Sequence, residues 1–309
     1  MTDVVILPPR APEIEPARAP EPDREEFAEP SPRANGREIA IVIGWGLTVF
    51  GALVLAYVIY LVGITQLEHA RSQRSLVEGF NQQLSVQAAP IGGRINEGTP
   101  VAMLQISRAG VHEIVVEGTS GTQLRKGPGH LRSSPLPGQP GNAVIACRRL
   151  TFSGPCYDIT GLKTGDRITV TTGQGKSVYR VTDVRNVHRG KQDVIANTGT
   201  NQLTIITSQR LVATERVAVI ARLVGRPFAP PNAARPDEIR SSELGLNTEG
   251  SDTLAVVLWL QLLLVACLLG VWLVRKQPRV STYVVMVPVL LTLTLLVFDS
   301  VTALLPSTL

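Results

Sequence analysis

The sequence predicts an all-β domain held at a membrane by three transmembrane helices. Three long apolar blocks without a charged residue interrupt an otherwise ordinary globular composition. Between the first and second blocks, short strand-like runs follow one another and are separated by Gly- and Pro-rich turns. No long amphipathic helical pattern interrupts these runs, which is typical of a β-sandwich or a β-barrel.

Residues 1–38 are expected to form a disordered cytoplasmic tail. They include the stretch "PPRAPEIEPARAPEP" and hold five Arg against nine Asp and Glu. A segment this rich in Pro, Glu and Ala cannot bury enough apolar surface to fold. We favour a plain solvated tail over a docking segment.

The three apolar blocks are residues 39–62, 253–274 and 280–298. Each is close to the roughly 20 residues that cross a bilayer. We expect three transmembrane helices, the third extending to about residue 305 and accommodating Pro288. The alternative is that some blocks are buried core helices. The first block begins too far into the chain for an ordinary cleaved signal peptide.

The basic loop at residues 275–279 sets the expected orientation. Its sequence "RKQPR" holds three basic residues, and short loops of this kind stay in the cytoplasm. The N-terminus is then cytoplasmic, and residues 63–252 lie outside the plasma membrane. The first span agrees only in part, because Arg33 and Arg37 precede it while Arg71 and Arg74 follow it.

The exported region is basic, with 22 Lys and Arg against 14 Asp and Glu over residues 63–250. This charge is suited to anionic membrane lipid or a wall polymer. No basic run is interleaved with aromatic residues, so a nucleic-acid partner is not expected. The region has no Cys/His cluster for a metal and no Gly-rich phosphate loop after a strand, so we expect no cofactor.

The exported region divides into a polar stalk with helical character (63–97), a β-domain (98–225) and a Pro- and Ser-rich linker (226–252). The chain around "TGQGK" predicts a hairpin. Cys147 and Cys156 lie in a compartment where disulfides persist, but their spacing alone does not establish a bridge. The seven predicted strands are "VAMLQIS", "VHEIVVEG", "NAVIACRR", "DRITVTT", "KSVYRVTDVRNV", "QLTIIT" and "RVAVIARLV".

The β-domain resembles sortases, most closely the class E group. The resemblance covers residues 98–225 and rests on "KGPGHLRSSPLPGQPGNAVIACRRLTF", "LKTGDRITV", "LTIITSQR" and "ERVAVIARLVG". It implies a closed β-barrel of about eight strands. It also implies a membrane-anchored cysteine transpeptidase of Gram-positive cell surfaces. Such enzymes cleave an LPxTG-like sorting signal between Thr and Gly and transfer the acyl group to an amine.

The resemblance also implies a catalytic His, Cys and Arg. Aligning "NAVIACRR" with the family's N-x-V-I-A-G-H-R pattern places Arg148 on the His and Cys147 on the preceding Gly. Ser208 falls on the Cys and Arg216 on the Arg. Two of the three catalytic positions are therefore replaced.

Two further residues complete the candidate site as substrate-binding residues. They are His130, in the "GPGH" stretch, and Thr207, beside the nucleophile position. The alternative roles are a loop residue that shapes the cleft for His130 and strand packing for Thr207. His112 and His188 have no evident partner and are expected at the surface.

The replacements change the chemistry of the site. A serine hydroxyl needs an adjacent general base, and the guanidinium of Arg148 has no acceptor atom. Arg148 and Arg216 together suit a carboxylate or phosphate better than acyl transfer. Cys147 would serve as a substitute nucleophile only if a one-residue bulge turned it toward Ser208. Arg216 has an alternative as a structural remnant held by Glu215 or Asp193.

Three functions follow. The first is a catalytically impaired pseudo-sortase that binds a sorting-signal peptide, a wall precursor or a membrane partner. The second is an active transpeptidase or hydrolase with Ser208 or Cys147 as its reassigned nucleophile. The third is a structural subunit of a membrane complex, to which Gln261 and Pro288 in the spans point weakly.

Overall fold

A computed structural model of the protein describes residues 36–188, 194–197, 199–208, 215–231, 252–276 and 280–304. The predicted tail up to residue 35, most of the linker (232–251) and loop residues 277–279 lie outside these ranges. The chain separates into two compact units, residues 1–51 and 52–309. The second unit contains the β-domain and the C-terminal helices.

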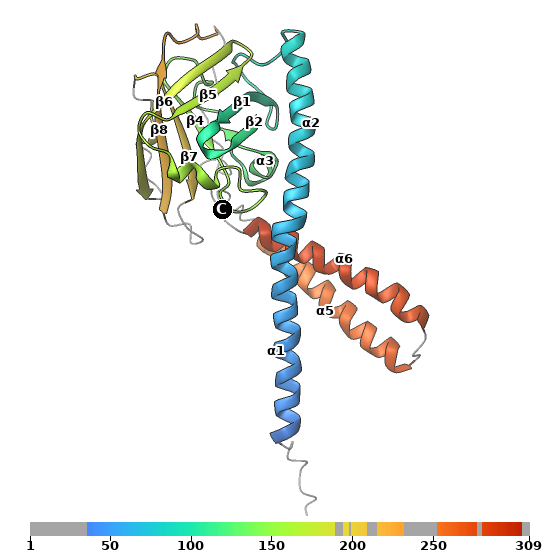
Figure 1. Ribbon diagram of the computed structural model, residues 1–309. Helices are drawn as coiled ribbons and strands as arrows, with labels where there is room; N and C mark the ends of the chain where they lie inside the picture. Colours follow the sequence, from blue (N-terminus) through green and yellow to red (C-terminus); the bar gives the residue numbers. More distant parts are fainter. Residues whose placement is uncertain are drawn as a thin grey trace, which may run out of the picture. The chain divides into compact units, whose positions relative to one another are not determined.

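Eight strands form a closed barrel in the order β1-β2-β3-β4-β7-β8-β6-β5 (Figure 1). The all-β barrel expected from the sequence is therefore confirmed. Seven strands match the predicted runs, and the eighth, β3, has only two residues. The strands are β1 Pro100–Ile106, β2 Val111–Glu117, β3 Gly129–His130, β4 Asn142–Ala146, β5 Arg167–Thr172, β6 Gly175–His188, β7 Gln202–Ser208 and β8 Glu215–Val224.

Strands β4 and β7 are the pair most relevant to the candidate site. They are neighbours in the barrel and run parallel. Their register pairs Asn142 with Gln202 and continues to Ala146 and Ile206. The two strands therefore end at the same edge of the barrel. Strand β8 runs antiparallel to β7 and begins at that same edge.

Side chains of β4 and β7 alternate between two faces, as the period of a strand requires. Ala143 and Ile145 of β4 join Leu203 and Ile205 of β7 in the main hydrophobic core inside the barrel. The outward-facing Val144 and Ile206 pack instead with Leu131 in a smaller cluster. Loop residues thus cover the outer face of this strand pair, and the side chains of its inner face fill the barrel.

A helix packs along one side of the barrel, where a stalk was expected. Helix α2 (Thr65–Ser85) contacts β1 and β2 and runs beside them in Figure 1. Phe80 is fully buried and clusters with Ile114. The amide of Gln73 accepts from the Ile114 N–H (2.8 Å) and donates to the Lys126 carbonyl (2.8 Å). The folded domain therefore begins well before residue 98.

The chain leaving the barrel folds back over its end. The Phe228 N–H donates to the Gly138 carbonyl (2.8 Å), and the Gly138 N–H donates to the Tyr179 hydroxyl (2.6 Å). Gly138 has φ +95, and a Cβ there would lie 2.7 Å from the Phe228 ring. This position therefore requires glycine, and the start of the predicted linker is part of the domain.

Two of the three expected membrane spans meet the length and composition of a spanning helix within the described residues. They lie in α5 (Asp252–Lys276) and α6 (Val280–Leu304), over Thr253–Leu273 and Thr282–Thr302. The apolar stretch described in α1 (Gly36–Ile59) is shorter, Leu47–Ile59. The first span therefore stays a prediction.

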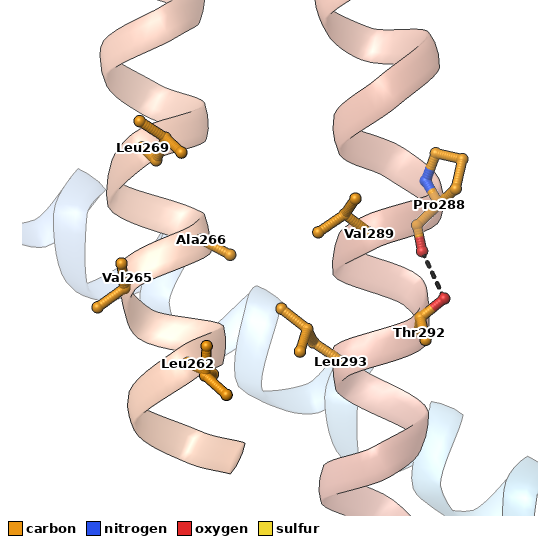
Figure 2. A pocket seen from close by; sticks show the side chains of 8 residues that line it. All are labelled: Leu262, Val265, Ala266, Leu269, Pro288, Val289, Thr292 and Leu293. Carbon is orange, nitrogen blue, oxygen red and sulfur yellow. Dashed lines mark hydrogen bonds between the residues drawn. The ribbon is translucent and has the colours of Figure 1, made fainter. Parts of the chain in front are cut away.

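An apolar cavity of about 520 Å³ lies between α5 and α6 (Figure 2). Val289 and Leu293 of α6 point across it toward α5. The Thr292 hydroxyl donates to the Pro288 carbonyl of its own helix (2.8 Å), so it is not directed at a ligand. The cavity is lined by Leu262, Val265, Ala266, Leu269, Pro288, Val289, Thr292 and Leu293.

Candidate functional site

The strand register brings the three positions predicted to be catalytic into one row. The Cys147 N–H donates to the Ile206 carbonyl (2.9 Å), which continues the β4–β7 ladder past the end of β4. Arg148 then lies level with Ser208 on the neighbouring strand. Ser208 in turn pairs with Arg216 on β8. The backbone positions have the order that the resemblance implied, with Ser208 between those of Arg148 and Arg216.

Ser208 is fully buried at the end of β7. Its hydroxyl forms no hydrogen bond with any residue that the structure describes. Its backbone carbonyl accepts from a guanidinium nitrogen of Arg149 (3.3 Å). A buried, unpaired hydroxyl is unfavourable, and a serine nucleophile requires a base that accepts its proton. No such base contacts Ser208 among the described side chains.

Arg148 is a buried cation held by neighbouring groups. Its guanidinium donates to the Thr151 hydroxyl (2.9 Å) and to the Gly121 carbonyl (3.3 Å), and it lies 4.9 Å from the centre of the Phe152 ring. Burial and, to a smaller extent, repulsion from Arg125 lower the pKa of Arg148 to about 9, against a smaller opposing effect of Glu68. A cation engaged in this way supplies no acceptor for the Ser208 proton.

A disulfide joins Cys147 to Cys156, which answers the question that their spacing left open. Both sulfurs belong to the barrel core. Cys147 follows Ala143 and Ile145 on the inner face, and the β4–β7 register shows no bulge that would turn it outward. The hypothesis of Cys147 as a substitute nucleophile is therefore wrong for this structure, because its sulfur is not a thiol and faces away from Ser208.

The disulfide closes a loop with an unusual backbone. Phe152 and Ser153 have φ of 54 and 67, a left-handed conformation that few non-glycine residues adopt. The centre of the buried Phe152 ring lies 5.4 Å from the Arg125 guanidinium and 4.9 Å from that of Arg148. The loop is thus fixed at its ends by the disulfide and in its middle by two cation–π contacts.

His130 is buried in a polar group that resembles a Ser–His–acid triad. Its Nδ1 lies 3.0 Å from a Glu117 carboxylate oxygen, and its Nε2 lies 3.1 Å from the Ser134 hydroxyl and 2.9 Å from the Pro135 carbonyl. The carbonyl can only accept, so Nε2 carries a proton and donates it. An imidazole in this state cannot take a proton from Ser134.

The hydroxyl of Ser134 is also committed elsewhere. It donates to the Leu131 carbonyl (2.8 Å) and accepts from the Val144 N–H (3.1 Å). The group therefore fastens β3 and the following turn to β4. His130 has both ring nitrogens on protein groups, and its role in substrate binding stays a prediction.

Thr207 points into the barrel beside the disulfide. Its hydroxyl donates to the Cys147 carbonyl (2.9 Å) and is buried. This bond ties β7 to the end of β4. The structure therefore places Thr207 in strand packing and not on the cleft side, where the candidate substrate-binding residue was expected.

Arg216 is partly buried opposite Ser208. The two acids proposed to hold it, Asp193 and the side chain of Glu215, lie outside the described part of the chain. Nothing in the sequence pattern pointed to Thr151, Phe152 and Arg125, which contact or lie near Arg148. The one signal in the sequence was an aromatic residue, Phe152, in the short segment between Cys147 and Cys156.

The closed barrel and the row at the ends of β4, β7 and β8 define a sortase-type domain. The family model of the sortase domain matches residues 104–224, which span most of the barrel. A comparison with curated proteins found no match.

Solved sortases are similar to this chain. A sortase D5 transpeptidase from Clostridium perfringens is 23% identical with a TM-score of 0.45, covering 50% of this chain and 99% of that chain. Sortase E from Streptomyces avermitilis is 26% identical with a TM-score of 0.38, covering 43% and 93%. Sortase C from Clostridium perfringens, solved with the C-terminal cell wall sorting motif, is 22% identical with a TM-score of 0.40, covering 50% and 89%.

Proposed function

We propose that the protein is a membrane-anchored pseudo-sortase that binds its ligand without transferring it. The observation that carries this proposal is the state of Ser208, whose buried hydroxyl has no base among the described residues. The second replaced position, Arg148, is held by Thr151 and Gly121 and cannot act as that base. Among the described residues, acyl transfer therefore lacks both an activated nucleophile and a proton carrier.

The ligand we propose is a sorting-signal-type peptide or a wall precursor that presents a carboxylate or phosphate. The sortase domain supports the peptide class. Arg216 supports the anionic group, because it lies opposite Ser208 and a guanidinium binds planar anions with paired hydrogen bonds. The net positive charge of the exported region would also attract such ligands toward the cleft.

We further propose that the barrel lies on the outer face of the plasma membrane and the N-terminus in the cytoplasm. The loop "RKQPR" between α5 and α6 supports this orientation. The Cys147–Cys156 disulfide supports it independently, because such bonds persist outside the cytoplasm. Membrane lipid is then a permanent neighbour of the domain.

Peptide binding by the full chain in lipid nanodiscs tests the proposal. Fluorescently labelled LPxTG- and LAxTG-type peptides should bind saturably, and Arg216→Gln should weaken binding about tenfold through loss of one charged hydrogen bond. Arg180→Gln, an exposed position on β6, is the matched control and should leave binding unchanged. Absence of saturable binding, or equal effects of the two variants, would contradict the proposed site.

A structural subunit of a membrane complex is the second candidate function. The C-terminal helices favour it, because α5 and α6 bury little of their apolar surface against the rest of the described chain. Membrane helices associate through packing and polar contacts, for which the cavity between α5 and α6 offers a recess. Purification in mild detergent should then yield a stable larger assembly, and a monomer at all detergent concentrations would exclude this function.

A further inference from the structure

An acidic residue at the end of α6 contacts the sortase domain. A carboxylate oxygen of Asp299 accepts from the Arg125 guanidinium (2.7 Å) and from the Tyr60 hydroxyl (3.4 Å). Arg125 belongs to the short helix α3 (Gly121–Lys126) of the domain, and Tyr60 to the π-helical turn Tyr60–Ile64 that follows α1. Asp299 therefore joins three segments that are far apart in the sequence.

Aromatic packing accompanies this ion pair. The Phe298 ring lies 5.1 Å from that of Tyr57 and 5.8 Å from that of Tyr60. One turn further along α6, the Thr302 hydroxyl lies 3.4 Å from the Tyr57 hydroxyl. Residues 298 and 302 share one face of α6, and residues 57 and 60 share one face of their helix. Two matching helix faces thus meet beside the ion pair.

The position of Asp299 argues that this contact is built in. It is the only charged residue in α6 and follows 19 residues without charge. A carboxylate at the end of a membrane span is costly unless a cation or hydrogen-bond donors compensate it. Arg125 supplies both, and its side chain is only 20% exposed against 49% for Asp299.

The same arginine reaches the candidate site. Arg125 lies over one side of Phe152, and Arg148 lies over the ring as well. Arg148 also donates to the carbonyl of Gly121, the first residue of α3. Two like charges near one ring repel each other, so a carboxylate on Arg125 lowers the cost of holding Arg148 beside it.

We propose that the Asp299–Arg125 ion pair docks the outer end of the C-terminal helical hairpin onto the sortase domain and positions the loop that carries Arg148. The hairpin is then a partner of the domain within the same chain, and its placement sets the arrangement of the cleft. The proposal requires α6 to end on the same side of the membrane as the barrel. It holds whether or not the cleft binds a peptide, so its tests do not use peptide binding.

Cross-linking in native membranes tests the docking. In a Cys267→Ser background, Tyr57→Cys with Thr302→Cys, a neighbouring pair that leaves the Asp299–Arg125 ion pair intact, should be joined by a short bis-maleimide cross-linker. A protease site inserted at residues 232–251 would report it, because only the cross-linked fragments stay together on a non-reducing gel. Arg180→Cys with Thr302→Cys is the matched control and should separate. Equal retention of the two pairs, or no retention of the first, would overturn the proposal.

Hydrogen exchange of the full chain in nanodiscs tests the effect on the loop. Asp299→Asn should raise exchange of peptides covering residues 121–126 and 147–156 about fivefold, which corresponds to one partly exposed charge pair. Asp299→Glu, which keeps the carboxylate, should restore most of the protection. Asp166→Asn removes the exposed ion pair with Arg108 and is the matched control. The proposal fails if Asp299→Asn changes these peptides no more than Asp166→Asn does.

Discussion

The inner and outer faces of the β4–β7 pair differ in how their polar groups are satisfied. On the inner face, Cys147 is bonded to Cys156, and the Thr207 hydroxyl donates to the Cys147 carbonyl. On the outer face, one residue further along each strand, the Ser208 hydroxyl has no partner among the described residues. Its neighbour Arg148 is a cation in a buried position.

The comparison shows that the barrel does not depend on catalytic chemistry. The inner face supplies the packing and the covalent bond that hold the strands, and it needs nothing from the outer row. Substitutions in the outer row are therefore expected to leave the register of the strand ends intact. Mutations on the two faces should then have different consequences.

Removal of the disulfide should have the largest effect on stability. Cys147→Ala with Cys156→Ala releases a loop with a sequence separation of 9 and leaves space in the core. We expect the free energy of unfolding to fall by about 2–4 kcal/mol. Thermal unfolding of the full chain in detergent measures the loss as a lower Tm, with Cys267→Ala as the control. Equal Tm values for the two variants would show that the Cys147–Cys156 disulfide does not stabilise the inner face of the strand pair.

Tyr179→Phe, also inside the barrel, should have a smaller effect. It leaves the Gly138 N–H without its acceptor, at a cost of about 1–3 kcal/mol. Burial also raises the pKa of Tyr179 to about 12, from 10.0 in the unfolded chain. Between these two values the unfolded chain has released the proton and the folded chain has not.

Wild-type stability should therefore fall as the pH rises from about 10 to 12, by up to about 1.4 kcal/mol for each pH unit. Tyr179→Phe should not show this part of the loss. Chemical unfolding curves of both proteins across that range give the comparison. Parallel losses of stability in the two proteins would mean that the phenol is not buried as described.

Ser208→Ala, on the outer face, should have the smallest effect. The variant removes a hydroxyl without a described partner, so we expect the free energy of unfolding to change by less than about 0.5 kcal/mol or to rise. Thr207→Ala is the matched control, because it removes a neighbouring hydroxyl that is hydrogen-bonded. A larger loss for Ser208→Ala than for Thr207→Ala would reverse the comparison between the faces.

Alternation and turn residues mark strands directly, so the sequence alone predicted seven strands in a β-sandwich or a β-barrel, and the resemblance to sortases supplied the closed barrel. Strand β3 was not predicted, because two residues cannot show an alternating pattern. Helix α2 was interpreted as a stalk, because Phe80 and Gln73 are too few to mark a buried helix face. Alternation also predicted that Cys147 faces away from the cleft.

The contacts of Arg148 could not be predicted from the sequence, for a physical reason. Arg125 and Phe152 reach it from α3 and from the disulfide loop, and only the closed barrel brings these segments together. The contact of Asp299 with Arg125 likewise joins residues 174 positions apart. No local pattern encodes contacts of this kind.

The most direct test of the central claim is the transpeptidation product formed by the full chain in nanodiscs. Wild type, Ser208→Ala and the double variant Ser208→Cys with Arg148→His would be incubated with LPxTG-type peptide and an amine, and the products measured by mass spectrometry. We predict no acyl-enzyme and no product for wild type or Ser208→Ala, and product above background for the double variant. Wild-type turnover that disappears in Ser208→Ala would contradict the account.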